Sequence, residues 1–205
     1  MRAPRQGSFG QAARLTVVDR LGVWLSARQI RRWAPSFRGK RVGDFGCGYD
    51  ARFARSILGE AAHVVLADVT LSPELRADAK IEARPGPLED TLPTLPDGSL
   101  DVVLCVSVLE HLWDPTTALT HIHRILSPGG SCLVNVPSWA GKRALEFSAF
   151  TLGMSPADEM NDHKTYYDTR DLWPLLVRAG FVPEDIRCFS HKLGLNTFAV
   201  CKKAG

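Results

Sequence analysis

Residues 43–54 read GDFGCGYDARFA, and this stretch decides the fold. It continues the short apolar run RVGDF at 41–45 and turns through Gly46 and Gly48 into a segment with helical character from Ala51. Glycine permits positive φ and a close approach of the backbone to a ligand, and the first N–H groups of a helix attract negative charge. A strand, a glycine turn and a helix in this order are typical of nucleotide-binding α/β folds.

Strand-like and helix-like segments alternate along the rest of the chain. Apolar runs predict strands at 63–68, 80–84, 100–109, 131–137, 185–190 and 196–201. Helical patterns with capping residues predict helices at 51–58, 115–126 and 168–179, and a proline-rich loop is expected at 88–99. The alternation predicts an α/β fold, with a mostly parallel sheet covered by helices on both faces.

The composition is that of a globular chain. Its 205 residues are 45% hydrophobic and 23% charged, and no apolar run approaches the length needed to span a bilayer. The five cysteines form no CxxC pair, which favours buried thiols in a reducing compartment over disulfides or a zinc site. The first ten residues lack the apolar stretch of a secretory signal, so we expect a cytoplasmic protein.

The N-terminal segment, residues 1–38, differs from the rest in charge. Residues 1–41 contain ten Lys/Arg and one acid, whereas the whole chain has a net charge of only +3. Apolar side chains recur there at helical spacing, at Leu15, Val17, Val18, Leu21, Trp24 and Leu25. We expect an accessory amphipathic helix that packs on the domain and leaves a basic face in solvent. Contact of this helix with a membrane surface or another anionic partner stays open.

Polar side chains gather where the predicted strands end. Asp44, Asp68, Ser107 and His111 lie at or just past strand C-termini. In parallel sheets these ends share one crevice, where ligands bind. Asp68 lies 20 residues beyond Gly48, at the end of the next strand, where an acid accepts hydrogen bonds from ribose hydroxyls. The pattern predicts a bound nucleoside.

Asp44 distinguishes between two kinds of nucleoside ligand. A carboxylate two residues before Gly46 would repel the pyrophosphate of a dinucleotide, which argues against a nicotinamide-dependent oxidoreductase. The same carboxylate suits a ligand that carries an ammonium or sulfonium group. S-adenosylmethionine combines adenosine with both of these cations.

Five stretches of the chain, taken together, resemble one family. They are VGDFGCGYD (42–50), LADVTLSPEL (66–75), LPDGSLDVVLCVSVLEHLWDP (95–115), RILSPGGSCLVNVPS (124–138) and HKTYYDTRDLWPLLVRAGF (163–181). In this order they resemble the class I S-adenosylmethionine-dependent methyltransferases of the small-molecule type. The resemblance implies a methyltransferase domain at 39–205, with a Rossmann-like sheet of seven strands whose last strand is antiparallel.

The resemblance also implies the cofactor contacts. The glycines would approach the methionine part, Asp44 its amino group, Asp68 the ribose and Val69 the adenine. The full implied set is Asp44, Phe45, Gly46, Cys47, Gly48, Asp68, Val69, Leu88, Glu89, Val106 and Ser107. Two positions depart from the family pattern: Asp50 stands where a third glycine is common, and Gly86-Pro87-Leu88 replaces Gly-Asp-Ala.

Two histidines are candidates for a general base, from which a hydroxyl acceptor benefits. They are His111, past the fourth strand, and His163, in the irregular segment before the last helix; a role in fixing loops is the alternative for both. No cluster with convincing metal-ligand spacing is evident, so we expect metal-independent transfer. Aromatic side chains that would line an acceptor pocket, or simply pack, are Trp139, Phe150, Tyr166 and Tyr167.

The expected reaction is methylation of a small molecule, on a hydroxyl oxygen of a natural product, sugar or lipid-linked compound. Nucleic-acid or protein methylation is the less favoured reading because no Asn-Pro-Pro-Tyr motif is present; Asn135-Val136-Pro137-Ser138 is only distantly similar. A non-catalytic protein with the same fold is a further alternative, which the intact set of Asp44, the two glycines and Asp68 opposes. The sequence is compatible with a monomer or a homodimer.

Overall fold

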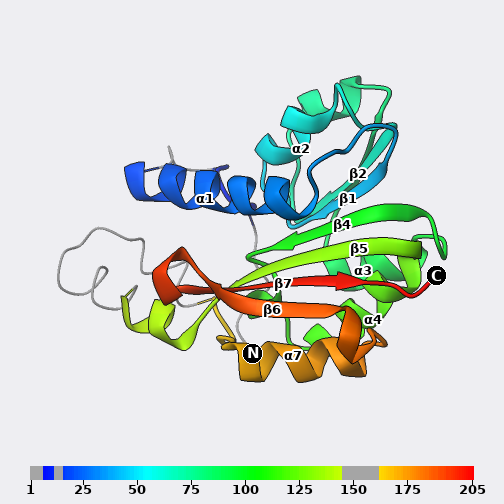
Figure 1. Ribbon diagram of the computed structural model, residues 1–205. Coiled ribbons are helices and arrows are strands. Elements are labelled where there is room, and N and C mark those ends of the chain that lie inside the picture. Colours follow the sequence, from blue (N-terminus) through cyan, green and yellow to red (C-terminus); the bar gives the residue numbers. More distant parts are fainter. Residues whose placement is uncertain (1–6, 12–15, 145–161) are drawn as a thin grey trace.

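The computed structural model describes residues 7–11, 16–144 and 162–205. In this part of the chain the strands form one seven-stranded sheet with the order β3-β2-β1-β4-β5-β7-β6 (Figure 1). β7 is antiparallel to both of its neighbours, and the other pairs are parallel. The predicted α/β architecture is confirmed. The strands are β1 (Arg41–Phe45), β2 (His63–Asp68), β3 (Ile81–Pro85), β4 (Leu100–Val106), β5 (Leu126–Pro137), β6 (Ile186–His191) and β7 (Asn196–Lys202).

Helices cover both faces of the sheet. The helices are α1 (Val17–Trp33), α2 (Arg52–Ile57), α3 (Leu88–Thr91), α4 (Pro115–Ile125) and α7 (Thr169–Arg178). α4 and α7 pack on one face in a core cluster that contains Leu119 and Leu176, whereas α2 and the end of α1 pack on the other with Ile57 and Ile30. The central strands β1 and β4 are therefore buried on both faces, as their nearly continuous apolar sequences predict.

Capping residues fix two helix starts, of which the sequence pattern predicted the one at Asp168 but not the one at Asp114. Asp114 accepts a hydrogen bond from the backbone N–H of Thr117 at 3.0 Å and begins α4. Asp168 forms a capping box with Asp171 at the start of α7, and Gly180, with φ 107°, follows its end.

Two predicted boundaries are wrong. The loop expected at 88–99 begins with α3 and a 3-10 turn, Leu92–Thr94, because Leu88, Leu92 and Leu95 lie at helical spacing and all enter the core. The strand expected to run to residue 109 ends at Val106, because Ser107 adopts φ 56° and the chain turns into the 3-10 helix Leu109–His111.

α1 lies within the N-terminal segment 1–38, where an amphipathic helix was expected, but the side of the helix that packs on the domain differs from the expected one. Ser26 and Ile30 are its buried residues, and Ala34 and Phe37 continue this contact into the core. Most of the apolar face predicted to pack on the domain instead lies in solvent: Val17 is 81% exposed, and Leu21 and Trp24 are each 54% exposed. No helix in the described part of the chain is long and apolar enough to cross a bilayer.

Candidate cofactor and active site

The glycine turn after β1 has room only for glycine at its two key positions. Gly46 and Gly48 have φ of 75° and 76°. A Cβ on Gly46 would overlap Val108 Cγ2, and one on Gly48 would lie 3.1 Å from the carbonyl oxygen of Phe9. The Gly46 N–H donates to the carbonyl of Ala67 at 2.7 Å, so the turn is held against the end of β2. The backbone here adopts the conformation that the sequence predicts.

Asp44 is a buried carboxylate beside this turn. It is 5% exposed, and burial together with the negative charge of Asp68 raises its pKa to about 7. Among the residues that the structure describes, none forms an ion pair with it. A cationic group of a ligand would supply the missing positive charge. Phe45 and Cys47 pack into the core around Asp44, and burial raises the pKa of the Cys47 thiol far above its usual range.

Asp68 joins the two loops of the predicted nucleoside site. Its Oδ2 accepts from the Gly48 N–H at 2.7 Å, and its Oδ1 accepts from the Val69 N–H at 2.8 Å. The carboxylate is thereby fixed at the end of β2. Val69 is half-buried directly beyond it, where the resemblance implies an adenine contact.

A short strap at residues 7–11 covers Asp68, and the sequence offered no signal for it. The Ser8 hydroxyl is hydrogen-bonded to Asp68 Oδ1 and accepts from the Thr70 N–H at 2.8 Å. The carbonyl of Phe9 accepts from the Tyr49 N–H at 2.9 Å. Ser8, although close to the N-terminus, is only 6% exposed. The strap therefore engages the carboxylate that is predicted to hold the ribose.

The expected adenine contacts beyond β3 lie in different environments. Leu88 is 8% exposed and belongs to the core, whereas Glu89 is exposed in the first turn of α3. A shallow hollow of about 290 Å³ opens next to them, at the end of β3. Its lining residues are Ala83, Arg84, Pro85, Gly86, Pro87, Asp90, Thr91 and Thr94.

The departure at Asp50 has a local explanation. Its carboxylate lies 3.7 Å from the Arg52 guanidinium, which offsets the extra negative charge. Of Asp50 and Ala51, the two residues that precede α2, Ala51 has the positive φ, at 44°. Asp50 is therefore compatible with the turn, because the left-handed conformation is one residue further on.

The end of β4 carries strain at the predicted cofactor edge. Ser107 is exposed with φ 56°, and its N–H donates to the carbonyl of Asn135 at 2.7 Å. Val106 is half-buried one residue earlier. A non-glycine residue held in this conformation is a feature that concentrates at functional sites. Asn135 itself is fully buried, and no described residue hydrogen-bonds to its side-chain amide, so this amide is available to a water or a ligand.

The two predicted bases come together past β4. His111 Nδ1 lies 2.9 Å from Asp162 Oδ2, and the rings of His111 and His163 are 4.8 Å apart. Lys164 Nζ pairs with the other oxygen of Asp162 at 3.2 Å. Ligand atoms of Glu110, His111 and His163 also lie within 4.8 Å of one another, a geometry able to take a metal ion that the sequence analysis did not anticipate.

The predicted acceptor aromatics divide into two groups. Tyr166 hydrogen-bonds to His163 Nδ1 at 3.1 Å, and the Trp139 ring lies 5.6 Å from that of Tyr166. These two side chains adjoin the histidine pair. Tyr167 lies in the hydrophobic core, where its hydroxyl donates to the Leu109 carbonyl at 3.3 Å and supports the turn before His111. Phe150 lies outside the described residues.

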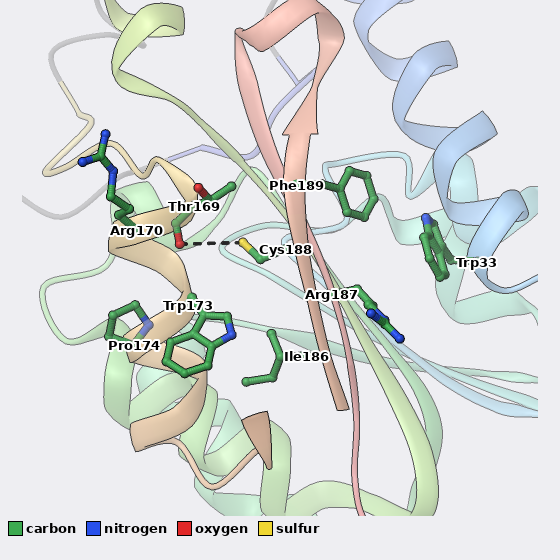
Figure 2. A pocket seen from close by; sticks show the side chains of 9 residues that line it. All are labelled: Trp33, Thr169, Arg170, Trp173, Pro174, Ile186, Arg187, Cys188 and Phe189. Atoms are coloured by element: carbon green, nitrogen blue, oxygen red, sulfur yellow. Dashed lines mark hydrogen bonds between the residues drawn. The ribbon is translucent and has the colours of Figure 1, made fainter. Parts of the chain in front are cut away.

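A separate groove of about 640 Å³ follows the outer strand β6 (Figure 2). Trp33 and Trp173 stand on opposite sides of it, with Arg170 and Arg187 at its rim. β6 ends the sheet on the β5 side, four strands away from β1 in the sheet order. This groove is therefore distinct from the cofactor edge.

Comparisons with known proteins agree with this geometry. A family model described as a methyltransferase domain matches residues 23–185. A Mycolicibacterium smegmatis protein named probable S-adenosylmethionine-dependent methyltransferase is 29% identical over 177 residues, which cover 84% of this chain and 64% of that protein. A ubiquinone biosynthesis O-methyltransferase of Psychrobacter arcticus is 29% identical over 179 residues, which cover 80% of this chain and 67% of that protein. The chain thus spans about two thirds of the length of these two relatives.

Solved structures show the same fold. A methyltransferase from Archaeoglobus fulgidus aligns with a TM-score of 0.63 at 17% identity, covering 88% of this chain and 94% of that one. A Burkholderia thailandensis N1-methyltransferase, solved with 1,6-didemethyltoxoflavin and S-adenosylhomocysteine, aligns with a TM-score of 0.63 at 18% identity, with 92% and 84% coverage. The family match over most of the chain replaces the nicotinamide-dependent alternative. The chain belongs to the class I S-adenosylmethionine-dependent methyltransferases.

Proposed function

We propose that this protein transfers the methyl group of S-adenosylmethionine to a hydroxyl oxygen of a small molecule. The observation that carries the proposal is the His111–Asp162 pair, 2.9 Å apart, at the edge of the sheet where the glycine turn also lies. A hydroxyl is a weak nucleophile at neutral pH and benefits from a base that removes its proton during attack. A sulfonium cofactor needs no such help from the protein.

The donor side fits S-adenosylmethionine in charge and shape. Buried Asp44 suits the ammonium group, the turn without side chains at Gly46 and Gly48 suits the methionine part, and Asp68 suits the ribose hydroxyls. When bound, the cofactor supplies an electrophilic methyl group. The protein needs only to align the acceptor oxygen with it and to exclude water.

On the acceptor side the histidine has an orienting partner. Asp162 Oδ2 lies 2.9 Å from His111 Nδ1, and this carboxylate favours a proton on Nδ1, so that Nε2 of the neutral ring carries none. His111 Nε2 would then take the hydroxyl proton as the new oxygen–carbon bond forms. Tyr166 lies next to His163, Trp139 lies next to Tyr166, and the two rings would form one wall of the acceptor site.

The relatives support oxygen as the acceptor atom. Several similar proteins are named ubiquinone biosynthesis O-methyltransferase, including one from Bordetella avium that is 34% identical over 113 residues, covering 49% of this chain and 44% of that protein. The Burkholderia structure named above is of an N1-methyltransferase, so nitrogen is the second candidate.

Matched pairs of acceptors test the proposal. The purified protein is incubated with S-adenosylmethionine and with phenols and anilines that differ only in OH against NH₂, and products are identified by mass spectrometry. Methyl ethers are expected, with a matching yield of S-adenosylhomocysteine. Methylated anilines without methyl ethers from the matched phenols would contradict the choice of oxygen.

The strap at residues 7–11 leads to a prediction about affinity. The Ser8 hydroxyl occupies one acceptor position of Asp68 that a ribose hydroxyl would use. Ser8→Ala is therefore expected to strengthen S-adenosylhomocysteine binding by about five- to tenfold, the upper part of the net contribution of about 0.5 to 1.5 kcal/mol that an ordinary hydrogen bond makes. Calorimetric titration measures the affinity.

The half-buried Ser99, whose hydroxyl donates to the nearby Pro96 carbonyl, supplies the control. Ser99→Ala should leave the affinity unchanged. Weaker binding by Ser8→Ala would instead assign the strap a supporting role in cofactor binding.

A further inference from the structure

The outward face of α1 carries an unusual line of side chains. Val17, Leu21 and Trp24 follow one another at spacings of four and three residues, which places them on one side of the helix. They are 81%, 54% and 54% exposed, and Val18 beside them is 64% exposed. In the described part of the chain, α1 attaches to the domain through Ser26 and Ile30, on the opposite side of the helix. Clustered apolar side chains in solvent mark an interaction site.

The same face is positively charged. Arg28 and Arg32 continue the line of Val17, Leu21 and Trp24 toward the end of α1, and Arg20 lies at its border; all three arginines are exposed. The Arg28 guanidinium lies 5.8 Å from the centre of the Trp24 ring. The only acid of α1, Asp19, is bound in the capping box with Thr16. The exposed face thus combines apolar groups and arginines without an opposing free carboxylate of its own helix.

A second element lies beside α1, on a different side of the helix from Val17, Leu21 and Trp24. The turn between β6 and β7 comes so close to α1 that a Cβ on Gly22 would lie 3.7 Å from Lys192 Nζ. Leu193, at the tip of this turn, is fully exposed, and its φ of 57° is unfavourable for leucine. Figure 1 shows this turn and the first half of α1 at the same end of the molecule as the carboxyl ends of the parallel strands.

We propose that the outward face of α1 binds the interface of an anionic lipid bilayer. A helix that lies in the plane of a membrane presents Leu and Trp to the acyl boundary and arginines to the lipid phosphates, which is the combination found on α1. The apolar ridge projects from the surface, as a bilayer requires. Because it adjoins the carboxyl edge of the sheet, membrane contact would bring that edge close to acceptors dissolved in the lipid.

Co-sedimentation with vesicles tests this surface without reference to catalysis. The full chain is mixed with vesicles of phosphatidylglycerol and phosphatidylcholine, or of phosphatidylcholine alone. Binding to the anionic vesicles is expected, and the double variant Leu21→Ser, Trp24→Ser should lose at least ~tenfold in partition. Arg28→Gln with Arg32→Gln should lose a similar factor, more at low salt than at high salt.

The matched control makes the same kinds of change on another surface. Trp173→Ser with Arg170→Gln alters the β6 groove and should bind vesicles like the wild type. Thermal melting verifies that each variant is folded; the α1 side chains are exposed, so little change is expected. Addition of vesicles should shift the tryptophan emission of the wild type to the blue. A smaller shift in Trp24→Phe than in the wild type would place Trp24 in the lipid.

Three results would overturn the proposal. One is failure of the folded wild type to bind anionic vesicles. Another is a wild type that dimerises with rising concentration and a double variant, Leu21→Ser with Trp24→Ser, that stays monomeric but still binds vesicles. This result would assign the face to a second copy of the chain. The third is tight binding of single-stranded RNA by the wild type that Arg28→Gln with Arg32→Gln abolishes, together with vesicle binding that Leu21→Ser with Trp24→Ser leaves unchanged.

Discussion

Asp44→Asn is expected to weaken S-adenosylhomocysteine binding by about 10- to 100-fold. The asparagine keeps the size of the side chain but removes the negative charge, and a buried hydrogen bond to a charged group is worth about 1.5 to 3 kcal/mol. Titration calorimetry at pH 8 measures the loss. Glu184→Gln, which removes an exposed carboxylate in the turn before β6, is the control and should bind like the wild type.

The pH dependence of binding provides a second measurement of the same residue. Burial raises the pKa of Asp44 to about 7, so its carboxyl is neutral at pH 5.5 and charged at pH 8. Wild-type affinity should rise with pH and level off above about 7, whereas Asp44→Asn should lack this rise. Unchanged affinity in the variant, or a wild-type profile flat across pH 7, would show that Asp44 does not pair with the ligand cation.

The stability of the ligand-free protein should change in the opposite direction. The folded form keeps the Asp44 proton between its ordinary pKa near 4 and about 7, and the unfolded form does not. The free energy of unfolding should therefore fall as pH rises through this window. In Asp44→Asn this component of the pH dependence is absent, which denaturant titration at several pH values detects.

His111→Ala is expected to lower kcat by about 10²- to 10⁴-fold, the usual contribution of a general base. The affinity for S-adenosylhomocysteine should change little, because no cofactor contact is assigned to this ring. Asp162→Asn should lower kcat by a smaller factor. It removes the carboxylate that lies 2.9 Å from His111 Nδ1 and orients the imidazole, but the imidazole itself stays in place. Steady-state kinetics with the best hydroxyl acceptor gives kcat and KM separately.

The control and an alternative complete this experiment. His121→Ala changes a histidine on α4, away from the pair, and should retain activity. The cluster of Glu110, His111 and His163 makes metal dependence the alternative explanation of a loss at His111. Activity that survives a chelator supports the base. Activity abolished by a chelator and restored by a divalent cation would assign His111 to a metal ligand instead.

Local sequence patterns predicted the frame of the molecule. The apolar runs identified the central strands, because burial on both faces excludes polar residues from a strand. The more exposed outer strands β3 and β6 followed from the alternation of strand-like and helix-like segments. Asp168 and Gly180 marked helix ends, because caps act within one turn. Leu88, Leu92 and Leu95 were misread as a loop, because proline content masked their helical spacing.

Contacts between distant segments required the tertiary structure. Ser8 and Asp68 are 60 residues apart, and His111 and Asp162 are 51 positions apart, so no local pattern pairs them. The same holds for α1, whose sequence shows an amphipathic helix but not which side faces the domain. The packing of Ser26 and Ile30 decided which side faces the domain, and it left Leu21 and Trp24 in solvent.

The sequence by itself determined the α/β frame and the positions of Asp44, Gly46, Gly48 and Asp68, because strand ends and turns depend on near neighbours. Only the tertiary structure decided which side chains pair across the site and which face of α1 is open, because those depend on packing between segments that the chain order does not place together.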